Sequence, residues 1–174
     1  DVEKAKSLLK EAGITTINLL CSDHGWFSAV RPIIRENLEA LGVSVNYDEK
    51  KSSDVYSFVD GDQGAWDVVI APGDPSVFGN DADLLLRWWY AGDTWTEQRM
   101  HWKGSEAYTA VQTKLDEAVR LEGEAQIATW QELFDLLSEQ VPLYPIFHRK
   151  TPTAYNPQTL VGFQPIALTG LSFV

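Results

Sequence analysis

An acidic residue, Asp74, stands where the chain is expected to leave a buried β-strand. Val68 to Ala71 is an unbroken apolar run rich in β-branched residues, typical of a central strand covered on both faces. Pro72 and Pro75 cannot donate to a sheet ladder and Gly73 tolerates unusual dihedral angles, so the chain leaves the sheet there. Ligands of open α/β sheets lie outside the carboxyl ends of the strands. Asp74 and Gly73 are therefore candidate ligand-binding residues. Alternatively, Asp74 is only a turn residue whose carboxylate accepts hydrogen bonds from backbone amides.

The histidines are not spaced as metal ligands. His24, His101 and His148 stand far apart, whereas metal sites commonly use two His residues one helical turn apart. The segment from Asp60 to Gly64 resembles the start of a calcium loop, but Ala71 occupies the position that needs a bidentate carboxylate, so we interpret it as a turn. No glycine-rich phosphate loop or Gly-x-Ser-x-Gly elbow occurs. We expect no metal, no cofactor and no enzymatic activity.

Composition limits the classes of partner. The 174 residues suit one compact domain, and 44% of them are hydrophobic. A formal charge of -11 opposes binding to nucleic acid by repulsion. The single cysteine, Cys21, cannot form an internal disulfide, and its apolar neighbours predict a buried thiol. No apolar run approaches the roughly 18 residues of a membrane span, and the absence of a starting Met suggests a piece of a longer protein.

The elements that must carry these residues alternate in type over the first half of the chain. Hydrophobic periodicity predicts an αβαβαβ order, which right-handed crossovers lay down as a mostly parallel sheet. The expected helices cover 2–12, 27–41 and a segment capped by Ser53 or Asp54 that ends near 59; the strands cover 15–22, 43–47 and 68–71. The strand ends then share one edge, which would hold residues 24–26, 50–54 and 72–75.

The second half is predicted to be mainly helical. Helices are expected over 83–90, 105–121 and 124–140, with edge strands near 143–148 and 153–155 and a sheet-pairing segment at 171–174. Residues 91–103 have little periodicity and are interpreted as a functional loop. Several aromatic residues flank this loop, and Trp95 or Trp102 is the one most able to stack on a peptide or sugar, with core packing as the alternative.

Four stretches together resemble the C-terminal lobe of the oligopeptide- and dipeptide-binding family of solute-binding receptors, which serve ATP-binding-cassette importers. They are residues 1–13 (DVEKAKSLLKEAG), 36–43 (ENLEALGV), 66–75 (WDVVIAPGDP) and 139–146 (EQVPLYPI). The resemblance spans nearly the whole chain, and its specificity lies in the order and spacing of the pieces. It implies one α/β lobe of a type II periplasmic-binding-protein-like fold, spanning 1–174 as part of a larger two-lobed receptor.

The resemblance also implies a function outside the cytoplasmic membrane. Such receptors close over a solute by a hinge and deliver it to permease subunits, and the full-length protein would be lipid-anchored. In peptide-binding relatives an aspartate just past the central strand pairs with the ligand's amino terminus. Asp74 matches either that residue or the acid of the Asp-Pro pair downstream, because the loop is shorter here. Family members also carry sugars, nickel complexes and other solutes.

We therefore expect a non-catalytic ligand-binding lobe for oligopeptides or similar solutes. Asp74 would anchor a positive group, and the cleft or lobe boundary would be lined by Gly73, His24, Trp26, Asp54 and Trp102. The remaining lobe of the same full-length chain would complete the site. Three alternatives stay open: a hydrolase of small polar substrates that uses Asp74 with His24, a carbohydrate-binding member of the same family, and a bare interaction module.

Overall fold

The computed structural model describes residues 1–73, 81–148, 150, 152 and 154–163, which form two compact units. Unit 1 is Asp1–Gly73 and unit 2 is Asp74–Val174. Asp74 and Pro75 lie outside the described residues. That the two units together make up one lobe over 1–174 stays a prediction.

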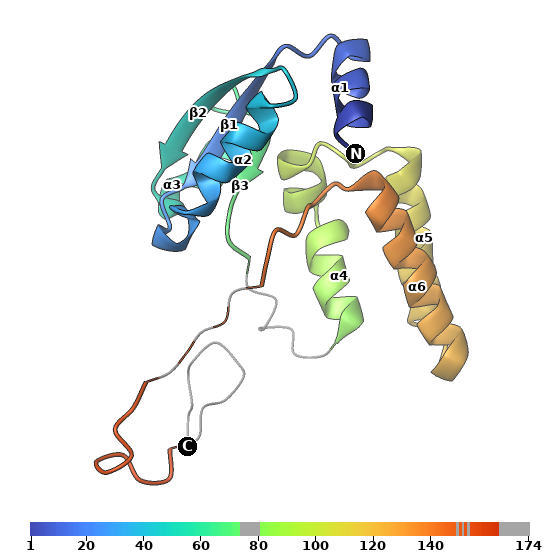
Figure 1. Cartoon of the computed structure of the whole chain (residues 1–174). Coiled ribbons are helices and arrows are strands. Elements are labelled where there is room, and N and C mark those ends of the chain that lie inside the picture. Colours follow the sequence, from blue (N-terminus) through green and yellow to red (C-terminus); the bar gives the residue numbers. More distant parts are fainter. Residues whose placement is uncertain (74–80, 149, 151, 153, 164–174) are drawn as a thin grey trace. The chain divides into compact units, whose positions relative to one another are not determined.

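Unit 1 contains a parallel sheet in which β1 is the middle strand (Figure 1). The strand order is β2-β1-β3, and both pairings are parallel, as the sequence predicts. Gly13, with φ of +67°, ends the first helix in the left-handed region, where glycine has no Cβ penalty. The elements are α1 Val2–Glu11, β1 Thr16–Ser22, the 3-10 turn η1 Gly25–Phe27, α2 Val30–Glu39, β2 Ser44–Lys50, α3 Ser52–Asp60 and β3 Val68–Ile70.

Side-chain alternation along β1 gives the sheet two apolar faces. Leu19 and Cys21 point to one face, where Ile34 of α2 packs against them. Leu20 points to the other face and contacts Val55 of α3. Two small clusters, one under each helix, therefore hold unit 1 together.

Three expectations for unit 1 need correction. The run 68–71 was predicted to be a central strand covered on both faces, but β3 pairs only with β1 in the described sheet, and Val68 is 37% exposed. The predicted strand 43–47 extends to Lys50, because all seven residues of β2 pair with β1. The N-cap of α3 is Lys51 rather than Ser53 or Asp54.

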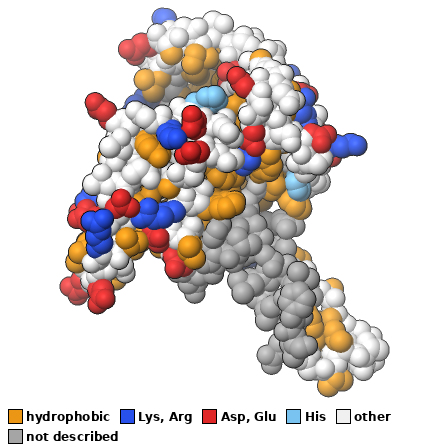
Figure 2. Space-filling view, turned by 180° about the vertical axis from the view of Figure 1, so that it is seen from behind, with side chains coloured by type: hydrophobic (Ala, Val, Ile, Leu, Met, Phe, Trp, Pro, Cys, Tyr) orange, Lys and Arg blue, Asp and Glu red, His pale blue; other side chains and the backbone are white. Residues whose placement is uncertain are grey.

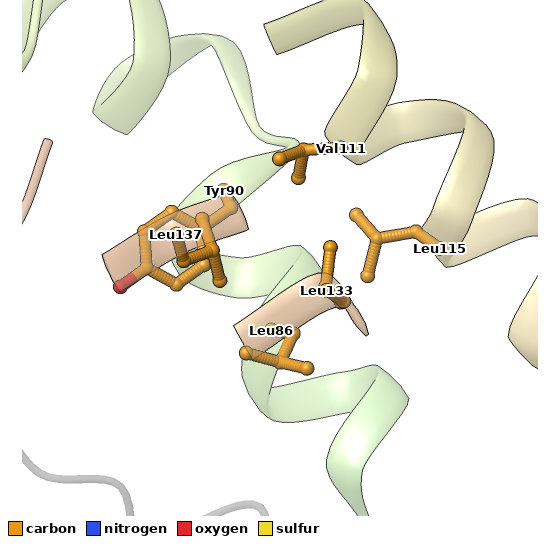
Figure 3. Close-up of a cluster of buried hydrophobic side chains, with 6 residues drawn as sticks. All are labelled: Leu86, Tyr90, Val111, Leu115, Leu133 and Leu137. Atoms are coloured by element: carbon orange, nitrogen blue, oxygen red, sulfur yellow. The ribbon is translucent and has the colours of Figure 1, made fainter. Parts of the chain in front are cut away.

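Unit 2 is a helical cluster whose buried residues come from three helices (Figure 3). Its elements are α4 Ala82–Tyr90, the π-helix η3 Thr94–Arg99, α5 Glu106–Ala118 and α6 Gly123–Gln140. Asp81 and Ser105 cap α4 and α5 by accepting from backbone amides three residues on. The six core residues are Leu86, Tyr90, Val111, Leu115, Leu133 and Leu137.

Two features of unit 2 differ from expectation. The segment 91–103 was predicted to be an irregular loop, but its centre is the π-helix Thr94–Arg99. Residues 143–148 form no strand, since Pro142 and Pro145 lack the backbone N–H groups that donate hydrogen bonds to a neighbouring strand. The predicted pieces at 153–155 and 171–174 fall wholly or partly outside the described residues.

Among the described helices, none has the length and apolar character needed to cross a bilayer.

Candidate functional site at the carboxyl edge of the sheet

The carboxyl ends of the three strands meet at one edge of unit 1. Ser22 ends β1 opposite Lys50, the last residue of β2, and the amide of Asp23 donates to the Lys50 carbonyl at 2.9 Å. The exit of β3 is held by α3, because the Tyr56 hydroxyl donates to the Pro72 carbonyl at 2.7 Å. The expectation that these strand ends share an edge is confirmed.

A carboxylate from β1's exit caps α3 across 29 residues of sequence. Asp23 Oδ1 accepts from the Ser52 backbone amide at 2.9 Å and from the Ser52 hydroxyl at 2.8 Å. The two hydrogen bonds from Ser52 hold the pKa of the Asp23 carboxyl below its usual range. The negative charge also suits the positive end of the α3 dipole. The first amide of α3 therefore already has an anionic partner within the protein.

His24 lies directly beside this cap. Its Nδ1 is 2.8 Å from the Ser22 hydroxyl oxygen and 2.7 Å from the Ser52 hydroxyl oxygen. Ser22 is 1% exposed, so this side of the imidazole faces the protein interior. The ring centroid lies 4.5 Å from that of Trp26, which is 39% exposed. A fixed imidazole and a partly exposed indole therefore stand together at the edge.

The structure brings some of the predicted site residues together and not others. His24 and Trp26 are in ring contact, as described above. Asp54 is exposed in the first turn of α3, where it accepts from the Ser53 hydroxyl at 2.7 Å. Gly73 is exposed at the end of unit 1. Asp74 lies outside the described residues, so its role stays a prediction.

Trp102 belongs to unit 2 and packs against the core cluster of that unit. Its ring meets Tyr90 and Tyr108 edge-on, at centroid distances of 6.3 and 5.6 Å. Its backbone amide donates to the Thr96 carbonyl at 2.7 Å. Trp102 Nε1 and Thr96 Oγ1 are buried atoms without a hydrogen-bond partner in the described part of the chain. The proposed ligand role of Trp102 stays a prediction.

Sequence reasoning missed three polar members of the edge cluster, Ser22, Asp23 and Ser52. Their roles depend on hydrogen bonds between segments about thirty residues apart, which no local motif encodes. The available signal was the parallel sheet itself. Once β1 and β2 are paired, residues 22–24 and 50–52 must lie side by side.

A second group of polar side chains lies on the α2 side of the sheet. Glu49 accepts from Arg31 and, at 2.8 Å, from the Tyr47 hydroxyl. Burial raises the pKa of Tyr47 to about 12, and the bond to Glu49 acts in the same direction. Cys21 is fully buried, as predicted, and burial raises the pKa of its thiol to about 11. This thiol is therefore inert rather than nucleophilic.

The surface charges are mixed in sign. Acidic and basic side chains are interspersed over the face seen in Figure 2. Several charged side chains of the described residues are paired, such as Arg87 with Asp83 and Asp116. A continuous basic face, which phosphate backbones would require, is not seen on that side. Within the described ranges, no three His, Cys, Asp or Glu side chains are grouped closely enough to hold a metal ion.

One hollow of unit 1 lies away from this edge. A cavity of about 480 Å³ opens at the amino ends of β1 and β3, beneath the end of α1. Asp67 lines it, but one oxygen of this carboxylate already accepts from the backbone and side-chain amides of Asn18, at 2.7 and 2.8 Å. The carboxyl edge, with residues 22–26 and 52–54, is called the rim below.

The hydrogen bonds at the rim do not follow the order of an acyl-transfer triad. In such a triad the carboxylate binds the imidazole, and the imidazole takes the proton of the hydroxyl. Here Asp23 binds the Ser52 hydroxyl, and Ser22 is buried from any substrate. This cluster is therefore arranged to fix side chains rather than to activate a hydroxyl. Pairing of His24 with Asp74, the rival hydrolase arrangement, is not tested by the described residues.

Known proteins resemble this chain in structure but not in sequence. No family model and no curated protein sequence matches it. NikA from Staphylococcus aureus in complex with Ni(L-His)2 superimposes with a TM-score of 0.65 at 16% identity, covering 82% of this chain and 30% of that chain. NikA from Brucella suis in complex with Fe(III)-EDTA gives a TM-score of 0.57 at 18% identity, covering 80% and 30%. The chain thus spans about 30% of the length of these structures, and it shares with them a mixed α/β fold that has a parallel sheet flanked by helices.

Proposed function

We propose that this chain is the ligand-binding lobe of an extracytoplasmic solute-binding protein. It would capture oligopeptides or similar solutes without chemical turnover and pass them to the permease subunits of an ATP-binding-cassette importer. The observation that supports this most is the rim of unit 1. There, the polar and aromatic residues 22–26 and 52–54 gather at the carboxyl edge of a parallel sheet, in a fold shared with two solute-bound NikA structures.

The electrostatics of the rim favour a solute with a positive or hydrogen-bond-donating group. The α3 N-terminus, which is the usual anion site of such an edge, is already occupied by the Asp23 carboxylate. Asp74 would add a second carboxylate at the exit of β3. When the other lobe closes and water leaves, a charge-assisted hydrogen bond to an ammonium group strengthens.

A chelated metal is the second candidate solute. The two similar structures carry Ni(L-His)2 and Fe(III)-EDTA, both of which are metal complexes rather than bare ions. A rim of imidazole, indole and carboxylate groups can bind the organic part of such a complex by hydrogen bonds and ring contacts. The peptide hypothesis and the chelate hypothesis assign the solute to the same rim and differ only in the kind of solute.

Permease subunits and the remaining lobe of the same full-length chain would contact this lobe, and the protein would act outside the cytoplasmic membrane, anchored by lipid. Cell fractionation of the full-length protein tests the location. Recovery in the cytosolic fraction would contradict it.

Native mass spectrometry of the full-length protein tests the function itself. We expect a small solute to remain bound after gentle purification and to be released on unfolding. A peptide would support the first reading, and a metal complex would support the second. A protein that carries no solute and binds none from a peptide and chelate panel would contradict both and favour the interaction-module reading.

A further inference from the structure

β3 has one edge that no other strand of the described sheet covers. The amide of Asp23, just past β1, donates to the last carbonyl of β2, so the backbone groups of odd-numbered residues along β1 point to β2. Those of the even-numbered Leu20 therefore point to β3, where Leu20 is in register with Val69. In a parallel pair, a residue bonds to the two neighbours of its register partner, here Val68 and Ile70. The N–H and C=O of Val69 consequently point to the open edge.

The backbone groups of Val69 lack hydrogen-bond partners in the part of the chain that the structure describes. Val69 is half-buried, because its side chain packs against the cluster of Leu20, Val55 and Val59. Backbone donors and acceptors that are shielded from water are almost always paired in folded proteins. The edge of β3 is therefore a place where a further backbone segment gains hydrogen bonds.

The two open edges of the described sheet are protected differently. β2 ends in the charged residues Asp48, Glu49 and Lys50, and charges along an edge oppose the addition of another strand. β3 consists of two valines and an isoleucine and carries no charge. The edge that is open to a further strand is thus that of β3.

The apolar side of α1 lies near the same end of the sheet. α1 is amphipathic, yet none of its residues is buried, and Leu8 is 54% exposed. A helix of ten residues is marginally stable alone in water and normally depends on the packing of its apolar face. The cavity of about 480 Å³ lies beside it, lined by Leu9 and Ile14 and by Val68 of β3. Apolar walls and an open strand edge therefore adjoin each other.

We infer that an extended apolar segment of the full-length protein, from outside residues 1–174, adds to the open edge of β3 and fills the cavity beside α1. Its backbone bonds to the N–H and C=O of Val69, and its side chains cover Leu9 and Ile14. This chain spans about 30% of the length of the two NikA structures, so a protein of that kind has further chain to supply the segment. A second copy is disfavoured, because each copy carries a formal charge of -11. The inference concerns an interface within the full-length protein and goes beyond solute binding.

Hydrogen exchange of the full-length protein, read at single amides by mass spectrometry, tests the pairing. We expect the Val69 amide to exchange at least about 100-fold more slowly than that of Tyr47, whose N–H points to the charged outer edge of β2. This protection should not change with protein concentration or with removal of copurified solute. Equal exchange at the two amides would overturn the inference. Protection that needs a high concentration would assign the edge to a second copy, and protection that needs solute would assign it to the solute; both would overturn the inference too.

Photo-crosslinking of the full-length protein identifies the segment. The probe p-benzoylphenylalanine replaces Ile14, which lines the cavity, and in a matched control it replaces Ile33 of α2, which is also exposed. We expect the probe at position 14 to link to a peptide of the same chain outside residues 1–174, and the probe at position 33 to give no such link. Links from position 14 only to residues 1–174, to a second copy or to nothing would overturn the inference. The proposed function fails separately, because its solute is expected at the carboxyl edge of the sheet: a copurified solute without the cross-link refutes only this inference.

Discussion

Removing the Thr96 hydroxyl should stabilise the protein. Thr96 is fully buried in the π-helix η3, and its Oγ1 has no partner in the described residues. A buried hydroxyl that has lost its water without gaining a partner costs about 1 to 3 kcal/mol. Valine keeps the β-branched shape, so Thr96→Val removes that cost with little change in packing. We expect a net gain of about 1 kcal/mol in the free energy of unfolding.

A second buried threonine in the same unit is the matched control. Thr129 lies on α6, and its hydroxyl donates to the Ala125 carbonyl at 3.0 Å. Thr129→Val therefore loses a hydrogen bond and should destabilise the protein by about 0.5 to 1 kcal/mol. The two substitutions are chemically identical and are made at buried helical positions, one with an unpaired hydroxyl among the described residues and one with a paired hydroxyl.

Differential scanning calorimetry or denaturant unfolding measures both variants. For a chain of this size, 1 kcal/mol corresponds to a change in Tm of roughly 2 to 4 °C, so the opposite signs are resolvable. Equal losses of stability in both variants would refute the reasoning, because they would show that the Thr96 hydroxyl has a partner.

Two further predictions concern strain and burial. Val141 ends α6 at φ 47°, a left-handed conformation that a β-branched residue adopts with strain, so Val141→Asn should gain about 1 kcal/mol in unfolding free energy. The similarly exposed Val119 ends α5 at φ -72°, and a comparable gain from Val119→Asn would contradict this explanation. The pKa of the Cys21 thiol is raised from about 9 to about 11 in the fold, so its contribution to stability is complete below about pH 9 and is lost as the pH rises through 11. Urea unfolding of Cys21→Ala should show a shallower loss over this range, and parallel curves would count against it.

The helices of unit 2 were predictable because their signals are local. The period-3.6 pattern and the capping Ser105 placed α5 and α6 within a few residues of their observed bounds. The π-helix could not be predicted, because its backbone bonds span five residues and leave no periodic signal in so short a segment.

The sheet was predicted in topology but not in its details. β2 was cut short because the alternation of apolar and polar residues stops at Tyr47, yet the charged residues Asp48, Glu49 and Lys50 continue the strand and pair with β1 through their backbone. The apolar run of β3 suggested a central strand. Whether a strand is central depends on which strands lie beside it, and the sequence of the strand alone does not give this.

The candidate site was predictable only in location. The rule that ligands lie beyond the carboxyl ends of strands indicated an edge at which the structure brings His24 and Trp26 together, while their role in binding stays a prediction. The capping of α3 by Asp23 depends on the tertiary fold, since this carboxylate follows β1 and lies 29 residues before Ser52 in the sequence. A sequence pattern searches for caps within a few residues and cannot find this one.

Calorimetric titration of the full-length protein with its copurified solute tests the central claim most directly. The claim is that the carboxyl edge of this sheet, with Asp74 at the exit of β3, binds the solute. We predict that Asp74→Asn weakens binding by about 1 to 3 kcal/mol without unfolding the protein. Asp62→Asn, which removes the same charge from an exposed turn, should leave the affinity unchanged. Equal affinities for the unmodified protein and both variants would contradict the account.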